Sequence, residues 1–217
     1  MTTVLHHHLG LGDHIICNGL VRTLAKDMPL SLVCKHHNFH NIKLMYSNNT
    51  NINIVSVYND EEARILGSNH NYIRLGVGLN PNFIPGMEQS WDKVFYDQAN
   101  INFENSWKFF DYVKPETQNP VPQESYVLLC NKGSDNIDRI DYRFVDIKLL
   151  KIYSDKGNFF ENVDLIQNAS EIHCINSSFI HFIDRIDISE KIKLFYHKNF
   201  KYKNHSNFTL KKKWILV

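Results

Sequence analysis

The first half of the chain alternates short apolar runs with segments whose apolar residues recur every three or four positions. The apolar runs predict strands, and the second pattern predicts helices that bury one face. The predicted strands are Thr2–His8, Leu30–Cys34, Asn51–Tyr58 and Tyr72–Leu75, and the predicted helices are Asp13–Lys26, Asn38–Tyr46, Asp60–Leu66, Trp91–Gln98 and Phe103–Tyr112. Because strands and helices alternate, this half is typical of a parallel sheet covered by helices.

The same rhythm begins again after the stretch Pro115–Gln123, which holds three of the six prolines and predicts a linker. Beyond it we expect strands at Tyr126–Cys130, Glu171–Ile175 and Lys191–Tyr196, and helices at Phe159–Ala169 and Ser177–Ile186. The stretch Phe144–Tyr153 fits a strand, or a helix followed by a strand. The prediction is an α/β fold with two small Rossmann-like lobes, residues 1–114 and 124–217, facing a cleft.

Composition narrows the function classes. The chain has 217 residues and a net charge of +1, which argues against a nucleic-acid binder that relies on bulk positive charge. Its four cysteines lie in or beside apolar runs without the spacing of zinc ligands, so we expect buried thiols in a reducing, cytoplasmic compartment. These residues are Cys17, Cys34, Cys130 and Cys174.

No signal peptide and no apolar run of about 18 residues is visible, so we expect a protein without a membrane span. The segment Lys211–Val217 combines three lysines with an apolar end. It can make weak contact with an anionic membrane surface, or it can dock on the body of the protein as a last strand or helix. We favour docking.

The turn Gly10-Leu11-Gly12-Asp13 stands between the first strand and the first helix. Glycines let the backbone pass close to a ligand, and the free N–H groups of a helix start attract anionic groups. Position 15 is Ile, so the turn lacks the third glycine of the dinucleotide fingerprint GxGxxG. The motif alone leaves two interpretations open, a ligand-binding turn or a helix start that Asp13 merely caps.

A second turn, Asn176-Ser177-Ser178-Phe179-Ile180-His181, occupies the equivalent place in the second half. Two hydroxyl groups at a helix start can donate to phosphate oxygens beside the backbone N–H groups. His181 follows Ser177 by four residues, so it can reach the same anion. The alternative is an N-cap serine and a histidine on the helix surface.

Together and in this order, the two turns resemble those of GT-B glycosyltransferases related to the bacterial lipopolysaccharide heptosyltransferases. That family has a Gly-Leu-Gly-Asp-type turn after its first strand, and Gly10, Gly12 and Asp13 match it. The second lobe of the family carries an Asp-Ser/Thr-Gly-x-x-His turn that holds the donor diphosphate. In this chain the places are taken by Asn176, Ser177, Ser178 and His181.

The resemblance implies a transferase of hexosyl or heptosyl type in polysaccharide biosynthesis. The substrates would be a nucleotide-sugar donor, bound by the second lobe, and a glycan or lipid-glycan acceptor, bound by the first. Asp13 would be the general base that takes the proton of the acceptor hydroxyl. Ser177, Ser178, His181 and Gly12 would surround the donor, and the reaction would invert the anomeric carbon without a metal ion.

Other residues are secondary candidates. Lys132 and Arg139 follow the first strand of the second lobe and can neutralise a diphosphate, or they are solvated loop cations. Glu161 can accept from a ribose hydroxyl, or it is an ordinary acid in the first turn of a helix. Gly10, His8, His14 and Asn176 are further candidates for contact with donor or acceptor.

The histidines also raise the question of a metal ion. On a strand His6 and His8 share one face, which supplies at most two ligands, and no acidic residue stands close by in the sequence. The pair His36 and His40 lacks the adjacent glutamate of a zinc protease helix. We therefore expect no metal and no cofactor other than the nucleotide-sugar, which is a substrate.

Two further hypotheses remain open at this stage. A nucleotide-sugar epimerase of the UDP-N-acetylglucosamine 2-epimerase kind shares the fold, but it needs more carboxylates in the cleft than the sequence offers. A non-catalytic module that binds a nucleotide-sugar or a glycan is supported by the short chain and by Asn176 and Ser178, which replace the Asp and Gly of the family's turn.

Overall fold

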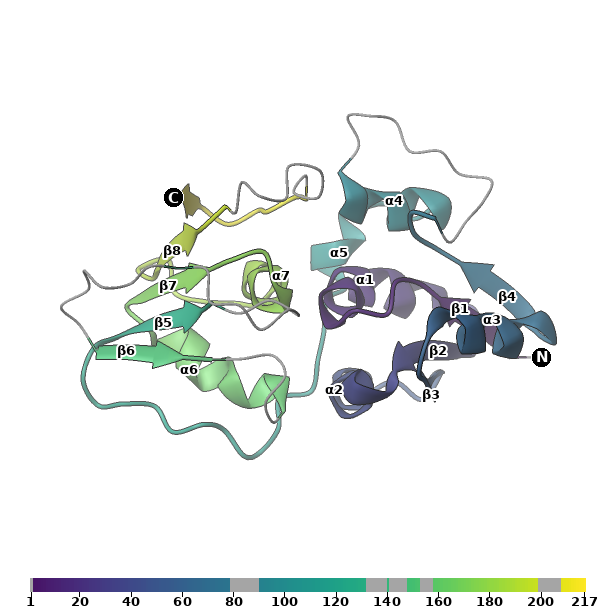
Figure 1. Cartoon of the computed structure of the whole chain (residues 1–217), viewed down its shortest axis with the longest axis horizontal. Helices are drawn as coiled ribbons and strands as arrows, with labels where there is room; N and C mark the ends of the chain where they lie inside the picture. The colour runs from purple at the N-terminus through teal and green to yellow at the C-terminus, as the bar shows by residue number, and fades with distance from the viewer. Residues whose placement is uncertain (1, 79–89, 132–139, 141–147, 153–157, 199–207) are drawn as a thin grey trace. The chain divides into compact units, whose positions relative to one another are not determined.

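The computed structural model describes residues 2–78, 90–131, 140, 148–152, 158–198 and 208–217 (Figure 1). The chain divides into two compact units. Unit 1 consists of Met1–Val113 with Asn207–Thr209, and unit 2 consists of Lys114–Ser206 with Leu210–Val217. Each unit is an α/β structure around its own parallel sheet, as the alternating pattern predicts.

Unit 1 is built on a four-stranded parallel sheet in the order β3-β2-β1-β4. Its strands are β1 (Thr3–His6), β2 (Leu30–Lys35), β3 (Ile52–Val57) and β4 (Asn71–Arg74). Its helices are α1 (Leu11–Leu24), α2 (Phe39–Met45) after the 3-10 turn η1 (His36–Asn38), α3 (Asp60–Ser68), α4 (Trp91–Gln98) and α5 (Asn105–Lys108).

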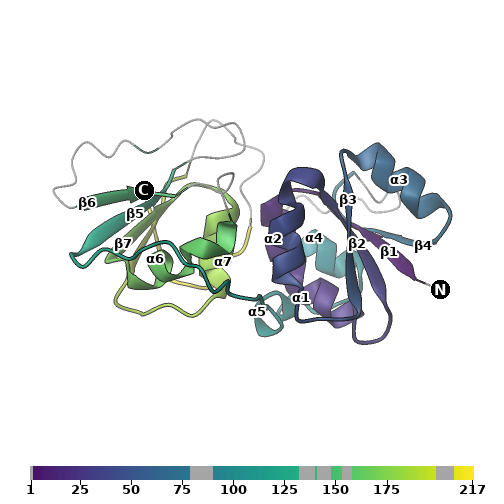
Figure 2. The same ribbon diagram turned by 90° about the horizontal axis from the view of Figure 1, so that it is seen from below.

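Helices cover both faces of this sheet (Figure 2). On one face α3 packs Ala63 against Val4 and Val33 of the strands. On the other face α1 is covered in turn by α4 and α5, so most of its side chains are buried. Gly19 of α1 permits the contact with α5, because a Cβ there would stand 1.9 Å from the carbonyl oxygen of Asn105.

Unit 2 is built on a five-stranded parallel sheet in the order β6-β5-β7-β8-β9. The strands are β5 (Tyr126–Cys130), β6 (Lys148–Lys151), β7 (Glu171–Cys174), β8 (Lys193–Tyr196) and β9 (Trp214–Leu216). The helices are the 3-10 turn η2 (Phe159–Asn162), α6 (Val163–Asn168) and α7 (Ser178–Arg185). Stacked rings of Phe159 and Phe179, with centroids 4.4 Å apart, join η2 to α7 in the core.

Most of the predicted elements are confirmed, and the differences have local causes. The helix predicted at Phe103–Tyr112 is only α5, because the Asp111 N–H donates to the Asn18 side chain instead of continuing a helix. The helix predicted at Phe159–Ala169 begins as a 3-10 turn. The end of the chain docks as predicted, since β9 pairs with β8. Among the described residues, no helix is long and apolar enough to cross a membrane.

Candidate functional site

In both units the strand order reverses beside the strand that carries a candidate turn. In unit 1 the chain runs from β1 outward through β2 to β3 and then returns to β4 on the other side of β1. In unit 2 the corresponding reversal lies between β5 and β7. Open α/β sheets bind ligands outside the carboxyl ends of their strands at such a switch point. The Gly-Leu-Gly-Asp turn follows β1 and the serine turn follows β7, so each lies at the switch point of its own unit.

Asp13 lies in the first turn of α1, which begins at Leu11 with Gly10 as its N-cap. Its Oδ2 accepts a hydrogen bond from the Gly10 N–H at 3.1 Å. A Cβ on residue 10 would stand 2.5 Å from that oxygen, so the carboxylate needs the glycine. Gly12 lies between them in the same turn and is half-buried. The structure therefore shows that Asp13 caps the helix start, as the capping interpretation predicts. It also places the carboxylate at the carboxyl ends of the strands, where open α/β sheets bind ligands.

Burial raises the pKa of Asp13 to about 6. The charge of His8, the N–H groups of Gly10 and Asp13 and the charge of Lys35 act in the opposite direction and are outweighed. Desolvation is therefore the largest influence on the pKa of this carboxyl, larger than the N–H groups of the helix start that favour its charged form. A carboxylate with this pKa is a stronger base than an exposed aspartate and is still mostly charged at neutral pH.

At the switch point of unit 1, His8 connects the segment after β1 with the segment after β4. Its Nε2–H donates to the carbonyl oxygen of Val77, beyond the end of β4, at 2.9 Å. Its ring stacks on Trp91 and meets Phe95 edge-on, with centroids 6.2 and 5.3 Å away. Gly76 makes room for the ring, since a Cβ there would stand 2.6 Å from His8 Cδ2. Sequence reasoning missed Gly76, although a Gly-x-Gly after a predicted strand is a signal of a close approach.

The remaining histidines of this region are internal. His6 hydrogen-bonds to the Tyr72 hydroxyl through Nδ1 at 2.7 Å and to Asp60 through Nε2 at 3.1 Å. His7 is fully buried, and burial lowers its pKa to about 3. His14 is also fully buried against the His7 ring, with a pKa well below the ordinary value, so it offers no surface to a ligand.

The second turn presents two serines at the start of α7. Ser177 is the N-cap residue, but its side chain makes no capping hydrogen bond. The buried Oγ atoms of Ser177 and Ser178 have no hydrogen-bond partner among the described residues. Asn176, beside them, is exposed. Because buried hydroxyls in proteins are normally paired, these two are open to an external acceptor.

His181 lies one turn further along α7 and is 3% exposed, not on the helix surface as the bland interpretation expected. Burial, with a smaller effect of the nearby Arg185 charge, lowers its pKa to about 3. It is therefore neutral at physiological pH and can offer a bound anion an N–H group but no charge.

Three further candidates were placed on the second lobe by sequence. Glu161 lies in η2, and its carbonyl oxygen accepts from the Asn119 N–H at 2.8 Å. Lys132 and Arg139 lie outside the described residues. Lys35 was missed, although it ends β2 at the same sheet edge as the turn after β1 and acts on the charge of Asp13.

No group of three or more His, Cys, Asp or Glu side chains in the described part of the chain is arranged to hold a metal ion. His36, for example, pairs through Nδ1 with the Ser56 hydroxyl at 3.1 Å and stacks on Tyr58.

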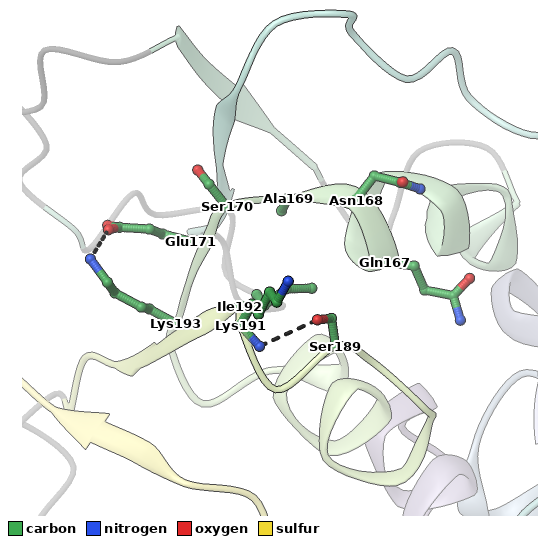
Figure 3. Close-up of a pocket in the computed structure, with 9 residues that line it drawn as sticks. All are labelled: Gln167, Asn168, Ala169, Ser170, Glu171, Ser189, Lys191, Ile192 and Lys193. Atoms are coloured by element: carbon green, nitrogen blue, oxygen red, sulfur yellow. Dashed lines mark hydrogen bonds and ion pairs between the residues drawn. The ribbon is translucent and has the colours of Figure 1, made fainter.

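A surface pocket of about 510 Å³ lies at the amino ends of the unit 2 strands, opposite the carboxyl ends where the serine turn lies (Figure 3). Glu171 and Lys193, which are paired at 2.9 Å across the amino ends of β7 and β8, contribute to its wall. Ser189 accepts there from the Lys191 N–H at 3.3 Å. Because the switch-point site lies at the carboxyl ends of these strands, this pocket is separate from the serine turn.

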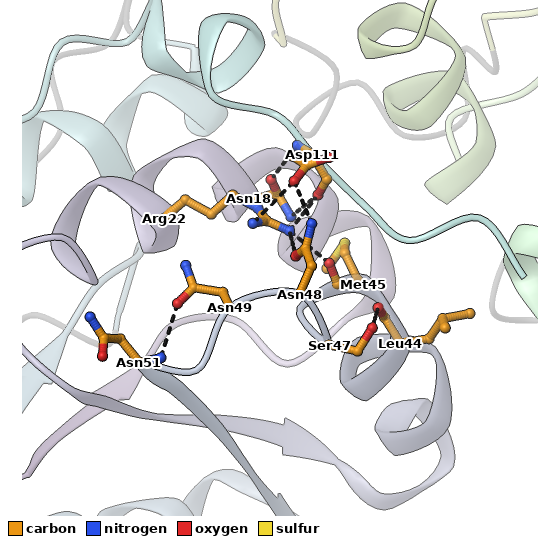
Figure 4. Close-up of polar contacts among 9 residues, drawn as sticks. All are labelled: Asn18, Arg22, Leu44, Met45, Ser47, Asn48, Asn49, Asn51 and Asp111. Atoms are coloured by element: carbon orange, nitrogen blue, oxygen red, sulfur yellow. Dashed lines mark hydrogen bonds and ion pairs between the residues drawn. The ribbon is translucent and has the colours of Figure 1, made fainter.

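Arg22 is the arginine of α1, and the partners of its largely buried side chain show that it is structural (Figure 4). Its guanidinium donates to the carbonyl oxygens of Met45 and Asp111, at 2.8 and 3.0 Å, and to Asn48. Asn18 exchanges two hydrogen bonds with the backbone of Asp111. These contacts hold the segment around Asp111 against α1 and α2. Because the Arg22 guanidinium is engaged in them, it does not serve as a phosphate-binding group.

Comparison with known proteins identifies the fold. The iron-containing dodecameric glycosyltransferase TibC from enterotoxigenic E. coli aligns with 89% of this chain and 57% of its own length, with a TM-score of 0.57 and 13% identity. The dodecameric iron-containing heptosyltransferase TibC in complex with ADP-D-beta-D-heptose aligns with 96% of this chain and 60% of its own length, with a TM-score of 0.56 and 13% identity.

The chain thus spans less than two thirds of these solved structures. No family model and no curated protein matches its sequence. The likeness confirms the predicted α/β, Rossmann-like fold and relates it to the fold of a glycosyltransferase.

Proposed function

We propose that this chain is a glycosyltransferase that moves a sugar from a nucleotide-sugar donor to a glycan or lipid-glycan acceptor. The observation that carries the proposal is the start of α7, where the buried hydroxyls of Ser177 and Ser178 lack partners at the switch point of the unit 2 sheet. A helix start with free N–H groups and two open hydroxyls suits the phosphates of such a donor. The complex of a TibC structure with ADP-heptose supports a donor of this class.

The leaving group of the reaction is a nucleoside diphosphate, which gains negative charge as its bond to the sugar breaks. The first N–H groups of α7 and the hydroxyls of Ser177 and Ser178 are donors that can stabilise this charge. The first turn of α7 contains no acidic residue that would oppose it. The neutral ring of His181 contributes its N–H dipole. Because these donors meet the developing charge, the proposed reaction is metal-independent.

Asp13 is the proposed general base. With its pKa raised to about 6, it is charged at neutral pH and can take the proton of an acceptor hydroxyl. The acceptor oxygen then forms a bond to the anomeric carbon, and the bond from that carbon to the diphosphate oxygen breaks. A single displacement of this kind inverts the anomeric centre.

Because the four cysteines are free and buried, we propose that the enzyme works in the cytoplasm.

A second candidate function is a non-catalytic module that binds a nucleotide-sugar or a glycan. It is favoured by Asn176 and Ser178, which replace the Asp and Gly of the resembled turn.

Nucleotide binding and donor hydrolysis separate the two candidates. Melting temperature is measured with UDP, GDP and ADP, and donor hydrolysis is followed in the wild type and in Asp13→Ala. A transferase raises its melting temperature with one diphosphate, hydrolyses the matching donor slowly and loses hydrolysis in Asp13→Ala. Binding without hydrolysis in both proteins would support the module. No stabilisation by any diphosphate would contradict the transferase and a module that binds a nucleotide-sugar, and would leave only a module that binds a glycan.

A further inference from the structure

Arg74 is the last residue of β4, at the carboxyl end of the unit 1 sheet. This strand lies beside β1, whose following turn carries Asp13. Within the described part of the chain, the Arg74 guanidinium has no hydrogen bond or ion pair, and its Nε atom is buried without a partner. The other described arginines, Arg22, Arg64 and Arg185, all donate to oxygen atoms. Because buried N–H groups in proteins are normally paired, Arg74 is open to an external acceptor.

The acids on the same side of the sheet already have partners. The Arg74 guanidinium lies 5.9 Å from the centre of the Tyr72 ring. The Tyr72 hydroxyl donates to His6 Nδ1 at 2.7 Å, and the Nε2–H of His6 donates to Asp60, the first residue of α3, at 3.1 Å. The other two acids in the first turn of α3 accept from a backbone N–H group and from an arginine of the same helix. The charge of Arg74 is therefore left for a ligand.

A second cation stands on the other side of β1. Lys35 ends β2, which flanks β1 opposite to β4. The strand register and the alternation of side chains put Lys35 on the same face of the sheet as Arg74. Because neighbouring strands are about 4.8 Å apart, β2 and β4 are about 10 Å from each other. The carboxyl edge of unit 1 thus offers positive charge on both sides of the strand that leads to Asp13.

A guanidinium recognises oxoanions by geometry as well as by charge. Its N–H groups form a rigid planar fork that fits two oxygens of a phosphate or carboxylate group. The ring of Tyr72 supports this fork from one side through a cation–π contact. The acids in the first turn of α3 oppose a diffuse attraction of anions, so affinity depends on direct contact with Arg74.

We propose that Arg74, with Lys35 as a second cation, binds a phosphate or carboxylate group of the acceptor, so that the acceptor is an anionic glycan. The ligand's role as acceptor rests on the proposed function, in which Asp13 takes the proton of an acceptor hydroxyl. Binding of the oxoanion itself requires no turnover and is measured separately.

The test follows the Nε–H signal of Arg74 in nitrogen-15 NMR spectra, assigned by its loss in Arg74→Gln. The titrations use the full chain with Ser177→Ala and Ser178→Ala, which removes the hydroxyls proposed to bind phosphate in unit 2. The probes are glucose 6-phosphate, glucuronate and, as the neutral control, glucose. We expect a saturable shift of the Arg74 signal with at least one charged sugar and none with glucose. The charged sugar that binds more tightly identifies the oxoanion.

Calorimetry with the tighter probe then measures the share of each cation. Arg74→Gln should lower the affinity about tenfold or more, because it removes hydrogen bonds to a charged group. Arg74→Lys keeps the charge without the fork and should bind with intermediate affinity. Lys35→Gln should lower the affinity about threefold, as expected for a supporting charge. Arg64→Gln is the matched control, because this exposed arginine is paired with Glu61, and it should bind within about twofold of the parent.

An unchanged Arg74 signal with both charged sugars would overturn the inference, as would equal losses of affinity in Arg74→Gln and Arg64→Gln. If a charged sugar binds at Arg74 but no nucleoside diphosphate raises the melting temperature and no donor is hydrolysed, the oxoanion site stands and the transferase function fails. If the donor is hydrolysed and neither charged sugar binds, the transferase function stands and its acceptor is not recognised by charge.

Discussion

The two candidate turns differ in how their polar groups are satisfied, although both join a parallel strand to a helix at a switch point. At the start of α1, the Asp13 carboxylate already accepts the Gly10 N–H and places a negative charge in the first turn. At the start of α7, the first turn has no acid, and the hydroxyls of Ser177 and Ser178 have no partner among the described residues. The same backbone arrangement therefore offers a base in unit 1 and a site for an anion in unit 2.

The electrostatic consequence follows from the charge at each helix start. The partial positive charge of a helix N-terminus attracts anions, but a carboxylate in the first turn neutralises it and repels a second anion. A phosphate is therefore expected at α7 and not at α1. The following substitutions test the groups on which this comparison between the starts of α1 and α7 depends.

The largest expected effect is the loss of catalysis in Asp13→Asn. The asparagine keeps an oxygen for the Gly10 N–H but cannot take a proton from the acceptor. We expect kcat of sugar transfer to fall by about 10² to 10⁴, the usual contribution of a general base. The affinity for a nucleoside diphosphate, which depends on unit 2, stays within about twofold of the wild type. Steady-state kinetics and calorimetry measure the two quantities, and unchanged turnover would rule out Asp13 as the base.

Ser178→Asp makes the start of α7 resemble the start of α1. The new carboxylate lies in the first turn and repels the diphosphate, so we expect diphosphate affinity to fall by about a hundredfold. Ser178→Asn is the matched control, because it is similar in size and uncharged. It should bind the diphosphate much more tightly than the aspartate variant, and equal affinities would mean that charge at this helix start does not govern binding.

Asp13→Asn should also stabilise the folded protein at neutral pH. The folded-state pKa of about 6 is raised above the ordinary value of 3.8, so the carboxyl favours folding below pH 3.8 and loses that contribution as pH rises through 6. At pH 7.5 the asparagine variant should therefore be more stable by about 3 kcal/mol, and this advantage should vanish below pH 4. Urea unfolding at several pH values tests this, and a variant less stable than the wild type at pH 7.5 would contradict it.

The smallest effect concerns acid sensitivity. Burial holds the pKa of His14 well below the ordinary histidine value of 6.5, so its contribution to stability is present above pH 6.5 and declines as pH falls below it. Each pH unit in this range costs up to about 1.4 kcal/mol for one such histidine. His14→Phe removes the proton-binding group, and its urea midpoint should fall less steeply between pH 6.5 and 5. The exposed His37→Phe should leave the slope unchanged, and equal slopes in wild type and His14→Phe would refute this assignment.

Sequence patterns predicted most elements of both sheets, because period-two and helical patterns depend on local order. They did not predict the short α5, since its end is set by Asp111, which bonds to Asn18 from a distant part of the chain. The switch points also needed the strand order, which no local pattern contains.

For the site, sequence correctly placed Asp13 and Ser177 at helix starts but misjudged their environments. The burial of His14 and His181 comes from packing across the sheet and between helices, which spacing along one helix does not reveal. For the same reason the raised pKa of Asp13 was missed, because desolvation depends on how the folded chain buries the carboxyl and not on its place along one helix. Gly76 was missed for a similar reason. Its role depends on the close contact between residue 76 and the His8 ring, which are far apart in the sequence.

Calorimetric titration of the wild type with the nucleoside diphosphate that most raises its melting temperature tests the role of the α7 start most directly. It is compared with the double variant Ser177→Ala with Ser178→Ala and with Ser189→Ala, a serine at the other edge of the unit 2 sheet. The double variant should lose about two orders of magnitude in affinity, because two hydrogen bonds to a charged group are removed, and Ser189→Ala should bind as the wild type does. Wild-type affinity in the double variant would mean that phosphates do not bind at the start of α7.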